Sequence, residues 1–171
     1  MQDKLIDIET LEGDKLIVSL CCNYPFIKNA LPADYRHLDI VEINCHCRQE
    51  EILSVGCGQE MLKRDDLREF ISQIVDNVDC EVSVKIRANV DGVDTLSIAK
   101  AIEDSGADYL HVDAMKKGIF EADWDLLNRI CENTGIKVIG NNSVNSIENV
   151  KKMIDTGVYG FSIARSVISG N

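Results

Sequence analysis

The sequence has little of what marks a fibrous, disordered or membrane-spanning protein. Only 2 of its 171 residues are proline and 5% are aromatic, whereas 45% are hydrophobic and 27% are charged. This is the composition of a globular domain. No apolar run approaches the roughly 18 residues of a membrane span. The first residues also lack the basic flank and apolar core of a signal peptide, so we expect a cytoplasmic protein.

Basic side chains are scarce as well. The chain has 18 Lys and Arg against 29 Asp and Glu, which gives a formal net charge of -11. Such a balance repels nucleic-acid phosphates and anionic lipids, so a nucleic-acid partner would need a local basic patch. The 7 cysteines are an odd number in a chain without an export signal. They indicate reduced thiols and not a disulfide framework.

Length is the next limit. A complete (β/α)8 barrel needs about 250 residues, so 171 residues are too few for eight ordinary units. The pattern is nevertheless barrel-like, because short β-branched runs recur with little polar alternation. Such runs predict parallel strands that are apolar on both faces. The predicted strands cover residues 16–20, 40–43, 82–86, 109–112, 138–139 and 161–163.

Amphipathic segments separate these strands. The clearest predicted helix begins at Asp65 and Asp66, which are favourable residues at a helix start. The apolar stripes are Leu67, Phe70, Ile71, Ile74, Val75 and Val78; Leu96, Ala99 and Ile102; Trp124, Leu127 and Ile130; and Ile147, Val150 and Ile154. Gly106, Gly135 and Gly157 are suited to left-handed caps that end the last three helices. This strand–helix order predicts an α/β fold, either a doubly wound sheet or a TIM barrel.

In both folds the functional residues gather where the parallel strands end. These positions are polar here: Cys21, Cys22 and Asn23; Asn44, Cys45, His46, Cys47 and Arg48; Arg87; Asp113; Gly140, Asn141, Asn142 and Ser143; and Ala164, Arg165 and Ser166. A Gly/Asn/Ser turn before a helix, beside a strand-end arginine, is typical of a phosphate cradle on the last two strands of a barrel. The alternative is an ordinary loop and helix cap.

Cysteines are the next candidates for chemistry. Cys47 follows a predicted strand among polar neighbours and a cation, which favours a reactive thiol. Cys45, Cys47 and Cys57, with His46, could instead bind zinc or an iron–sulfur cluster, although their spacing is atypical of such sites. Free cysteines can also be small buried hydrophobes. We expect that of Cys80 and Cys131.

Two polar residues lie inside predicted strands. Lys85 is costly there unless its ammonium meets an anion or another partner, and His111 lies in the next strand. If both point inward, they offer hydrogen-bond donors to one ligand with electron-rich carbonyls or a ring nitrogen. The alternatives are a lysine that reaches solvent along its stem and a satisfied core histidine.

At this point the sequence resembles the tRNA-dihydrouridine synthases. The resemblance rests on the segments NCHCR at 44–48, GCGQEML at 56–62, VKIR at 84–87, His111, ADW at 122–124, IGN at 139–141 and AR at 164–165. More closely, the chain resembles an archaeal group of TIM-barrel proteins related to these synthases, and more distantly the dihydroorotate dehydrogenases. The match is in order from about residue 15 to residue 171. It implies an FMN-type (β/α)8 barrel, with about six of the eight units in this chain, as one incomplete domain over residues 1–171.

The resemblance also implies roles for individual residues. Lys85 and His111 would hydrogen-bond the isoalloxazine ring of FMN, and Asn44 would lie near flavin and substrate. Residues implied at the phosphate are Gly140, Asn141, Asn142, Ser143, Ala164 and Arg165. Cys47 would donate a proton to C5 of a uracil ring as reduced flavin delivers hydride to C6. We therefore expect a flavin-dependent oxidoreductase acting on a C=C bond conjugated to a carbonyl, with Cys47 as proton donor or acceptor.

The sequence departs from the synthase pattern near the substrate. His46 and Arg48 flank Cys47 where the synthases have Gly and Pro, and Ser19 stands where they have Gln. Asp113 replaces the first arginine of an RNA-contacting loop, and the helical RNA-binding domain that follows the barrel in the synthases is not part of this sequence. With a net charge of -11, a small pyrimidine-like substrate is favoured over tRNA, because phosphate neutralisation supplies much of nucleic-acid affinity.

Two other functions remain open. A phosphate-binding TIM-barrel lyase or isomerase without flavin would use Asn141 and Arg165 for the phosphate, with Asp113 as a candidate base. A non-catalytic relative of the synthases is the other. In either case six strands cannot close an eight-stranded barrel, and the last helix is cut short at Asn171. We expect the chain to be part of a longer protein, or to be completed by a second polypeptide or a homo-oligomer.

Overall fold

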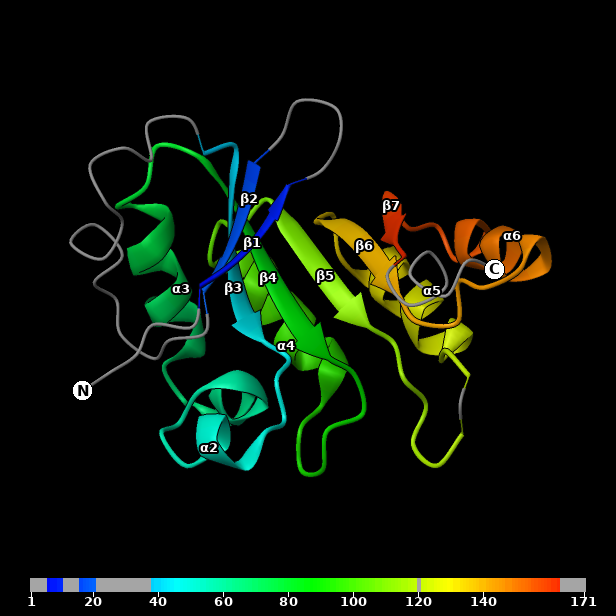
Figure 1. The fold of residues 1–171 in the computed structure, drawn as a ribbon, viewed down its shortest axis with the longest axis horizontal. Coiled ribbons are helices and arrows are strands. Elements are labelled where there is room, and N and C mark those ends of the chain that lie inside the picture. Colours follow the sequence, from blue (N-terminus) through cyan, green and yellow to red (C-terminus); the bar gives the residue numbers. More distant parts are fainter. Residues whose placement is uncertain (1–5, 11–15, 21–37, 120, 164–171) are drawn as a thin grey trace.

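The computed structural model describes residues 6–10, 16–20, 38–119 and 121–163. Seven strands form one sheet, and their spatial order follows the chain from β1 to β7 (Figure 1). The strands are β1 (Ile6–Thr10), β2 (Leu16–Leu20), β3 (Ile40–Cys45), β4 (Glu81–Arg87), β5 (Tyr109–Asp113), β6 (Lys137–Asn141) and β7 (Gly160–Ser162). β1 pairs antiparallel with β2, and each later pair is parallel.

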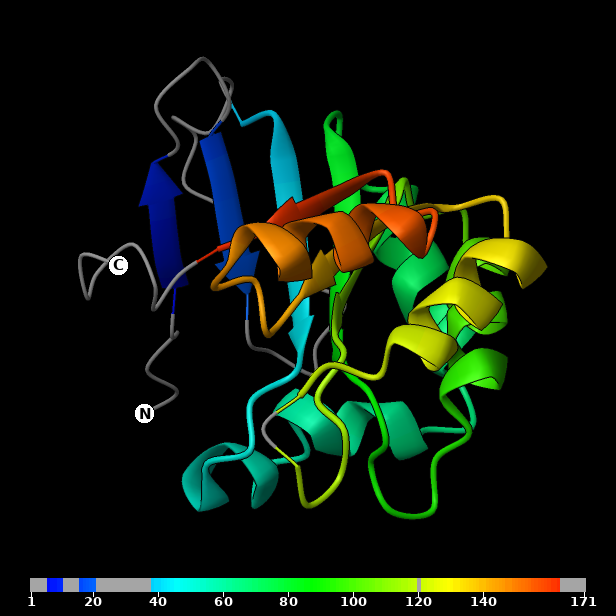
Figure 2. The same ribbon diagram turned by 90° about the vertical axis from the view of Figure 1, so that its right-hand side faces the viewer.

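Helices follow the parallel strands from β3 onward. They are α2 (Glu50–Leu53), the 3₁₀ helix η1 (Gly58–Lys63), α3 (Leu67–Val75), α4 (Thr95–Asp104), α5 (Trp124–Asn133) and α6 (Ile147–Asp155). Figure 2 shows α4 and α5 together on one side of the sheet. None of the described helices is long and apolar enough to span a membrane.

The helix-facing side of the sheet forms the core. Val41 and Ile43 of β3, Val84 of β4 and Leu110 of β5 are fully or almost fully buried. They belong to one cluster with the apolar residues of α3, α4 and α5, which removes a continuous apolar surface from water. Ile71 is buried in the same cluster, as its place in the predicted stripe requires.

The opposite face of the same strands is polar. In the strand register, Asn44 lies opposite Lys85, and Lys85 lies opposite His111. Glu42 precedes Asn44 by two residues and therefore shares this face. The expectation that the strands are apolar on both faces is therefore wrong for this inner face. It holds only for the face that packs on the helices.

The predicted TIM-barrel type of α/β fold is confirmed. In a doubly wound sheet the strand order reverses and helices cover both faces, whereas here the order never reverses. Each predicted strand is present, within two residues of its expected ends. The antiparallel strand β1 was not predicted, because its sequence IDIET alternates apolar and charged residues and shows no buried run.

The helix ends agree with expectation in part. Gly106 and Gly157 have φ values of +86° and +85°, a left-handed conformation that favours glycine. Gly135 has no positive φ; α5 ends on Thr134, whose backbone is extended. Asp66 precedes α3 as expected, although its side chain pairs with Arg64 and makes no cap hydrogen bond.

The apolar stripe of α6 is the other correction. Ile147 and Ile154 were expected to be buried, but they are 72% and 57% exposed, and Met153 is the buried residue. The cause is Gly140 of β6, which leaves room for a helix side chain. A Cβ at Gly140 would lie only 2.3 Å from Met153 Sδ, so Met153 occupies this space and the two isoleucines face away from the strand.

Candidate functional site

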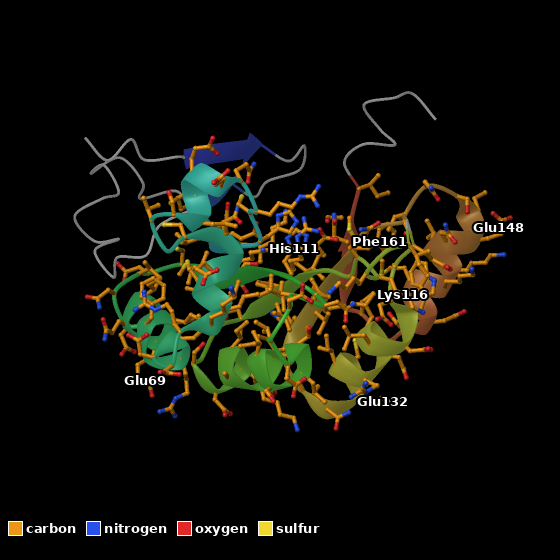
Figure 3. All side chains as sticks on the ribbon, turned by 90° about the horizontal axis from the view of Figure 1, so that it is seen from below. Glu69, His111, Lys116, Glu132, Glu148 and Phe161 are labelled. Carbon is orange, nitrogen blue, oxygen red and sulfur yellow. The ribbon has the colours of Figure 1, made fainter. Side chains whose placement is uncertain are left out.

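The predicted site residues of β3 to β6 lie on the inner face and at the carboxyl ends of these strands. His111 lies near the middle of the molecule, whereas the labelled residues of α3, α5 and α6 lie at its periphery (Figure 3). His111 is 7% exposed. The fold thus places a titratable ring at the centre of the sheet, where a buried polar group needs partners.

His111 is held from both sides by side chains of other strands. Its Nδ1 lies 2.8 Å from Glu42 Oε2 of β3, and its Nε2 lies 2.9 Å from Ser162 Oγ of β7. Asn141 Nδ2 donates to the same Ser162 Oγ at 2.6 Å, and Ser83 Oγ donates to Glu42 Oε2 at 3.1 Å. We call these five residues the inner-face chain. It connects the five parallel strands from β3 to β7.

Glu42 is a buried acid in the inner-face chain. Burial alone would raise the pKa of Glu42, but the hydrogen bond with His111 and the electrostatic effects of His111 and Lys85 outweigh it, so the pKa lies below its ordinary value. The carboxylate is therefore ionised at neutral pH. Lys85 is half-buried on the same face. Its positive charge lowers the pKa of Glu42, so Glu42 is the anion that was expected near this lysine.

A second cluster lies at the rim, where β3, β4 and β5 end. Asp113 Oδ2 is 2.7 Å from His46 Nε2 and 3.3 Å from Arg87 Nη2, and Asn142 Nδ2 donates to Asp113 Oδ1 at 3.0 Å. Burial opposes ionisation, but the hydrogen bonds from His46 and Asn142 and the charge of Arg87 lower the pKa of Asp113 to about 2. We call these four residues the rim cluster.

His46 Nε2 touches two partners in the rim cluster but can hold only one proton. It lies 2.7 Å from Asp113 and 3.0 Å from Arg87 Nη2. The shorter contact with an acceptor requires the proton on Nε2, which makes His46 a donor to Asp113. Arg87 then pairs with the same carboxylate. Arg87 Nε is buried and has no hydrogen-bond partner among the described residues.

Cys47 lies beside this cluster on a loop held by Asn44. The Asn44 Oδ1 atom accepts hydrogen bonds from the backbone N–H groups of His46 and Cys47, at 3.1 and 3.3 Å. Gln59 N donates to the Cys47 carbonyl at 2.9 Å. A Cβ on Gly58 would lie 2.3 Å from that carbonyl oxygen, so the close approach requires glycine. The Asn44 oxygen thus shapes the turn that carries Cys47.

The turn after β6 was expected to hold a phosphate. Asn142 and Ser143 have positive φ values of 93° and 61°, and Ser143 Oγ accepts from the Ala122 N–H at 2.9 Å. The Asn141 and Asn142 side chains are engaged with the inner-face chain and the rim cluster. Phosphate binding here therefore stays a prediction. Ala164 and Arg165, the other residues predicted to bind the phosphate, lie outside the described residues. The same is true of the strand-end residues Ser166, Cys21, Cys22 and Asn23.

The remaining cysteines are spread through the fold. Cys45 is buried with its thiol 3.9 Å from Met61 Sδ, and Cys57 is buried too. Over the described ranges, no three His, Cys, Asp or Glu side chains lie together in a way that could hold a metal ion. Cys80 and Cys131 are half-buried, less than expected, and burial raises the pKa of both thiols.

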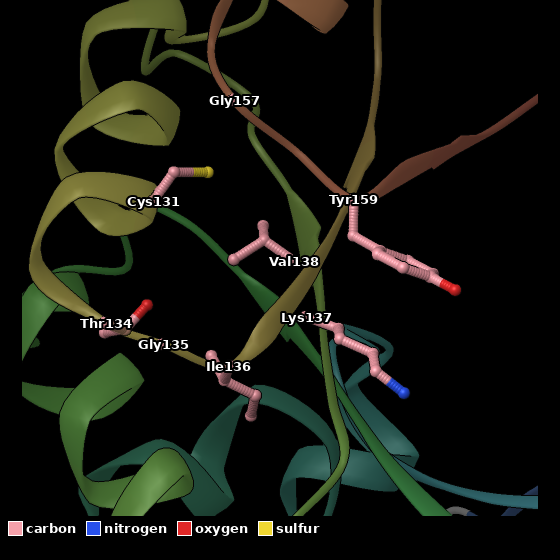
Figure 4. A pocket seen from close by; sticks show the side chains of 8 residues that line it. All are labelled: Cys131, Thr134, Gly135, Ile136, Lys137, Val138, Gly157 and Tyr159. Atoms are coloured by element: carbon pink, nitrogen blue, oxygen red, sulfur yellow. The ribbon is translucent and has the colours of Figure 1, made fainter.

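Two hollows lie away from the inner-face chain. A cavity of about 300 Å³ opens near the amino ends of β6 and β7, between Cys131, Val138 and Tyr159 (Figure 4). Lys137 lies beside it with its ammonium 4.8 Å from the centre of the Tyr109 ring. The other hollow, about 460 Å³, is formed by the loops after β4 and β5.

Sequence reasoning missed Glu42 and Ser162 and assigned no joint role to His46, Arg87 and Asp113. These residues could have been found from the alternation of side chains along a strand, because every second residue points to the same face. Glu42 and Asn44 share a face, as do Lys85 and Arg87, and His111 and Asp113. Reading alternate positions would have separated a polar inner face from the apolar outer one.

Known proteins match this chain over most of its length. Residues 3–169 match the family described as Dihydrouridine synthase (Dus). The "Uncharacterized protein MJ0144" of Methanocaldococcus jannaschii is 38% identical over 142 residues, which are 80% of this chain and 53% of that protein. The tRNA-dihydrouridine synthase B of Pseudomonas putida is 28% identical over 134 residues, 74% of this chain and 40% of that protein. The chain thus spans about half the length of these relatives, or less.

A solved structure agrees with the fold. The YdjI aldolase of Escherichia coli K12 superposes with a TM-score of 0.54 at 15% identity, over 84% of this chain and 49% of that one. At this identity the likeness shows the fold alone. The sequence match is the stronger finding, since it covers residues 3–169 of 171, and the chain therefore belongs to the dihydrouridine synthase family.

Proposed function

We propose that the protein is an FMN-dependent oxidoreductase, which reduces or oxidises a C=C bond conjugated to a carbonyl in a uracil-type ring. The observation that carries the proposal is the polar inner face. There Lys85 and His111 lie opposite each other on neighbouring strands, and Asn141 follows from β6. Family membership supports a flavin-dependent reaction, and the strand positions support the assignment of Lys85 and His111 to the cofactor.

The residues present fit a flat polar ring. Gly160 lies opposite Ile139, which lies opposite His111, so Gly160 shares the level of Lys85 and His111. A Cβ at Gly160 would meet none of the described residues within 4 Å, apart from its chain neighbours. As far as the described residues go, the inner face is therefore open beside Lys85 and His111. Lys85 and His111 would hold the ring of FMN, and the turn from Gly140 to Ser143 would hold its phosphate.

Cys47 is the proposed proton donor or acceptor. Bound FMN would supply or accept hydride at one carbon of the double bond. The neighbouring carbon then needs a proton, because addition of hydride alone leaves an enolate. The Cys47 thiol is half-buried and its loop is fixed by Asn44 and Gly58. A group on such a fixed turn can meet a ring that lies over the inner face.

The substrate class follows from the family and the charge together. The relative from Pseudomonas putida is named as a tRNA-dihydrouridine synthase, so a uracil ring is the proposed reacting group. A small pyrimidine remains favoured over tRNA as its carrier, because the chain has a formal net charge of -11. Asp113 also stands where the synthases have the first arginine of an RNA-contacting loop.

The first experiment is the visible spectrum of the purified full chain with added FMN. A bound flavin is expected, and a protein that takes up no FMN would overturn the proposal. With flavin bound, Cys47→Ala should leave uptake nearly unchanged and slow turnover of uracil compounds at least about 100-fold, the usual contribution of a positioned proton donor. Cys131→Ala is the matched control, since Cys131 lies at the other end of the strands. Equal turnover of the two variants would remove Cys47 from this role.

The phosphate-binding lyase or isomerase predicts another result. A colourless protein that binds phosphate esters, and that loses activity in Asp113→Asn, would favour it. A protein that binds FMN but turns over neither free pyrimidines nor uridine in tRNA would favour the non-catalytic relative. The pair of measurements, flavin uptake and turnover, separates the three functions.

A further inference from the structure

We propose that Glu42 is a positioning residue, which fixes the His111 imidazole with its proton on Nδ1 and presents Nε2 to the inner face as a hydrogen-bond acceptor. Glu42 lies on β3 and His111 on β5, 69 residues apart in sequence. The inference concerns the state of His111 in the protein itself. Only its consequence for FMN rests on the proposed function.

The direction of the inner-face chain follows from its two ends. Asn141 Nδ2 can only donate, so Ser162 Oγ accepts its hydrogen bond at 2.6 Å. The amide is oriented with its nitrogen toward β7 because Nδ2 also faces the Ser162 carbonyl oxygen, at 3.4 Å. The hydroxyl keeps its own proton, which it can donate to His111 Nε2, 2.9 Å away. This donation is compatible only with an unprotonated Nε2.

The other end of the inner-face chain places the ring proton. Glu42 is an ionised carboxylate, which can only accept hydrogen bonds. Its Oε2 lies 2.8 Å from His111 Nδ1, so Nδ1 carries the proton. Ser83 donates to the same oxygen at 3.1 Å, and Lys85 supplies the nearby positive charge. All members of the chain are thereby satisfied in one direction, which is the condition for a stable buried polar network.

This arrangement gives His111 Nε2 two uses without movement of the ring. In the neutral imidazole Nε2 accepts a hydrogen bond. When the ring takes up a second proton, Nε2 becomes a donor, and the Glu42 carboxylate balances the new charge at 2.8 Å. In an FMN site the same nitrogen would bind an acceptor or a donor on the flavin in place of Ser162 Oγ, its partner in the described structure. Glu42 would set which form prevails.

The test is the position of the His111 ring proton in the FMN-free full chain. Long-range ¹H–¹⁵N spectra of ¹⁵N-labelled protein distinguish the two tautomers, and His111→Gln identifies the His111 signals among the 3 histidines. At about pH 8.5, where an ordinary imidazole is neutral, Nδ1 should be protonated and Nε2 should not. The opposite tautomer in the native chain would overturn the inference.

Three variants separate Glu42 from its neighbours. Glu42→Leu removes the acceptor at Nδ1, so the main tautomer should reverse and place the proton on Nε2. Ser162→Ala and Ser83→Ala each remove one hydroxyl of the inner-face chain but keep the Glu42 carboxylate. In both variants His111 should keep its proton on Nδ1. If Glu42→Leu does not fold, Glu42→Gln is the milder substitute and should lower the Nδ1–H fraction. A reversal in Ser162→Ala, no reversal in Glu42→Leu, or an unchanged Nδ1–H fraction in Glu42→Gln would show that Glu42 does not position the ring.

A second arm separates this inference from the proposed function. If FMN binds, Glu42→Gln should shift the midpoint potential of the flavin, measured by spectroelectrochemistry, whereas Ser83→Ala should not. Failure of FMN uptake would overturn the proposed function and leave the tautomer result standing. Bound FMN with the opposite tautomer, or with equal potentials in the two variants, would overturn the role of Glu42 alone.

Discussion

Replacement of Asp113 tests the rim cluster directly. Asp113→Asn keeps the shape of the side chain but removes the charge that Arg87 and His46 share. The pKa of Asp113 falls from its ordinary 3.8 to about 2, which corresponds to about 2.4 kcal/mol of stability at neutral pH. Arg87, with only 13% of its side chain exposed, would also lose its anionic partner. We therefore expect a loss of about 2–4 kcal/mol.

The assay is urea unfolding followed by circular dichroism. With a slope of about 2 kcal/mol per molar urea, the midpoint should fall by about 1–2 M. Because the folded-state pKa lies below the unfolded-state value, the contribution is complete above 3.8 and is lost as the pH falls through 2. At pH 3 the stabilisation that comes from ionisation of Asp113 should be about 1.3 kcal/mol.

Asp91→Asn is the control for this experiment. Asp91 pairs with Lys117 on the surface, where the two side chains are 84% and 72% exposed, and such a pair adds little to stability. Its loss should leave the urea midpoint almost unchanged. A loss in Asp113→Asn as small as in this control, or one that does not shrink between pH 7 and pH 3, would refute the assignment of a depressed carboxyl pKa to the rim cluster.

Two further predictions concern the backbone around the site. Gly58→Ala should cost about 1–3 kcal/mol, because its Cβ would lie 2.3 Å from the Cys47 carbonyl. Gly106→Ala has the same sign of φ but a nearest neighbour at 3.6 Å, so thermal unfolding should show a smaller loss, about 1 kcal/mol; equal losses would contradict the close approach. Asp123→Ala removes the side-chain cap of α5 and should cost about 1–2 kcal/mol in urea unfolding, and an unchanged midpoint would show that the cap is unimportant.

The strands and the helices that cover their outer face were predictable, because each is encoded by a pattern of residues that are close together in sequence. The runs around Val41, Val84 and Leu110 predict buried strands, and the stripe from Leu67 to Ile74 predicts α3. The position of α6 was not predictable in the same way. Its buried residue is chosen by Gly140 of a different element, so spacing alone favoured Ile147 and Ile154 over Met153.

The site was predictable in its members more than in its contacts. Lys85, His111 and Cys47 were found because each is unusual at a strand or strand end. Glu42 was missed, since a buried acid is rare and becomes favourable only when His111 arrives from two strands away. The pairing of His46 with Asp113 joins residues 67 positions apart, and no local pattern encodes such a contact.

The sheet order β1 to β7 has a consequence for how the chain folds. Each described strand pairs with the strand next to it in sequence. Every strand pairing therefore closes a loop made only of the segment between two consecutive strands. Closing short connections costs less chain entropy than closing long ones. The sheet can therefore grow strand by strand from its amino-terminal side during synthesis, and each new strand finds an edge that is already formed.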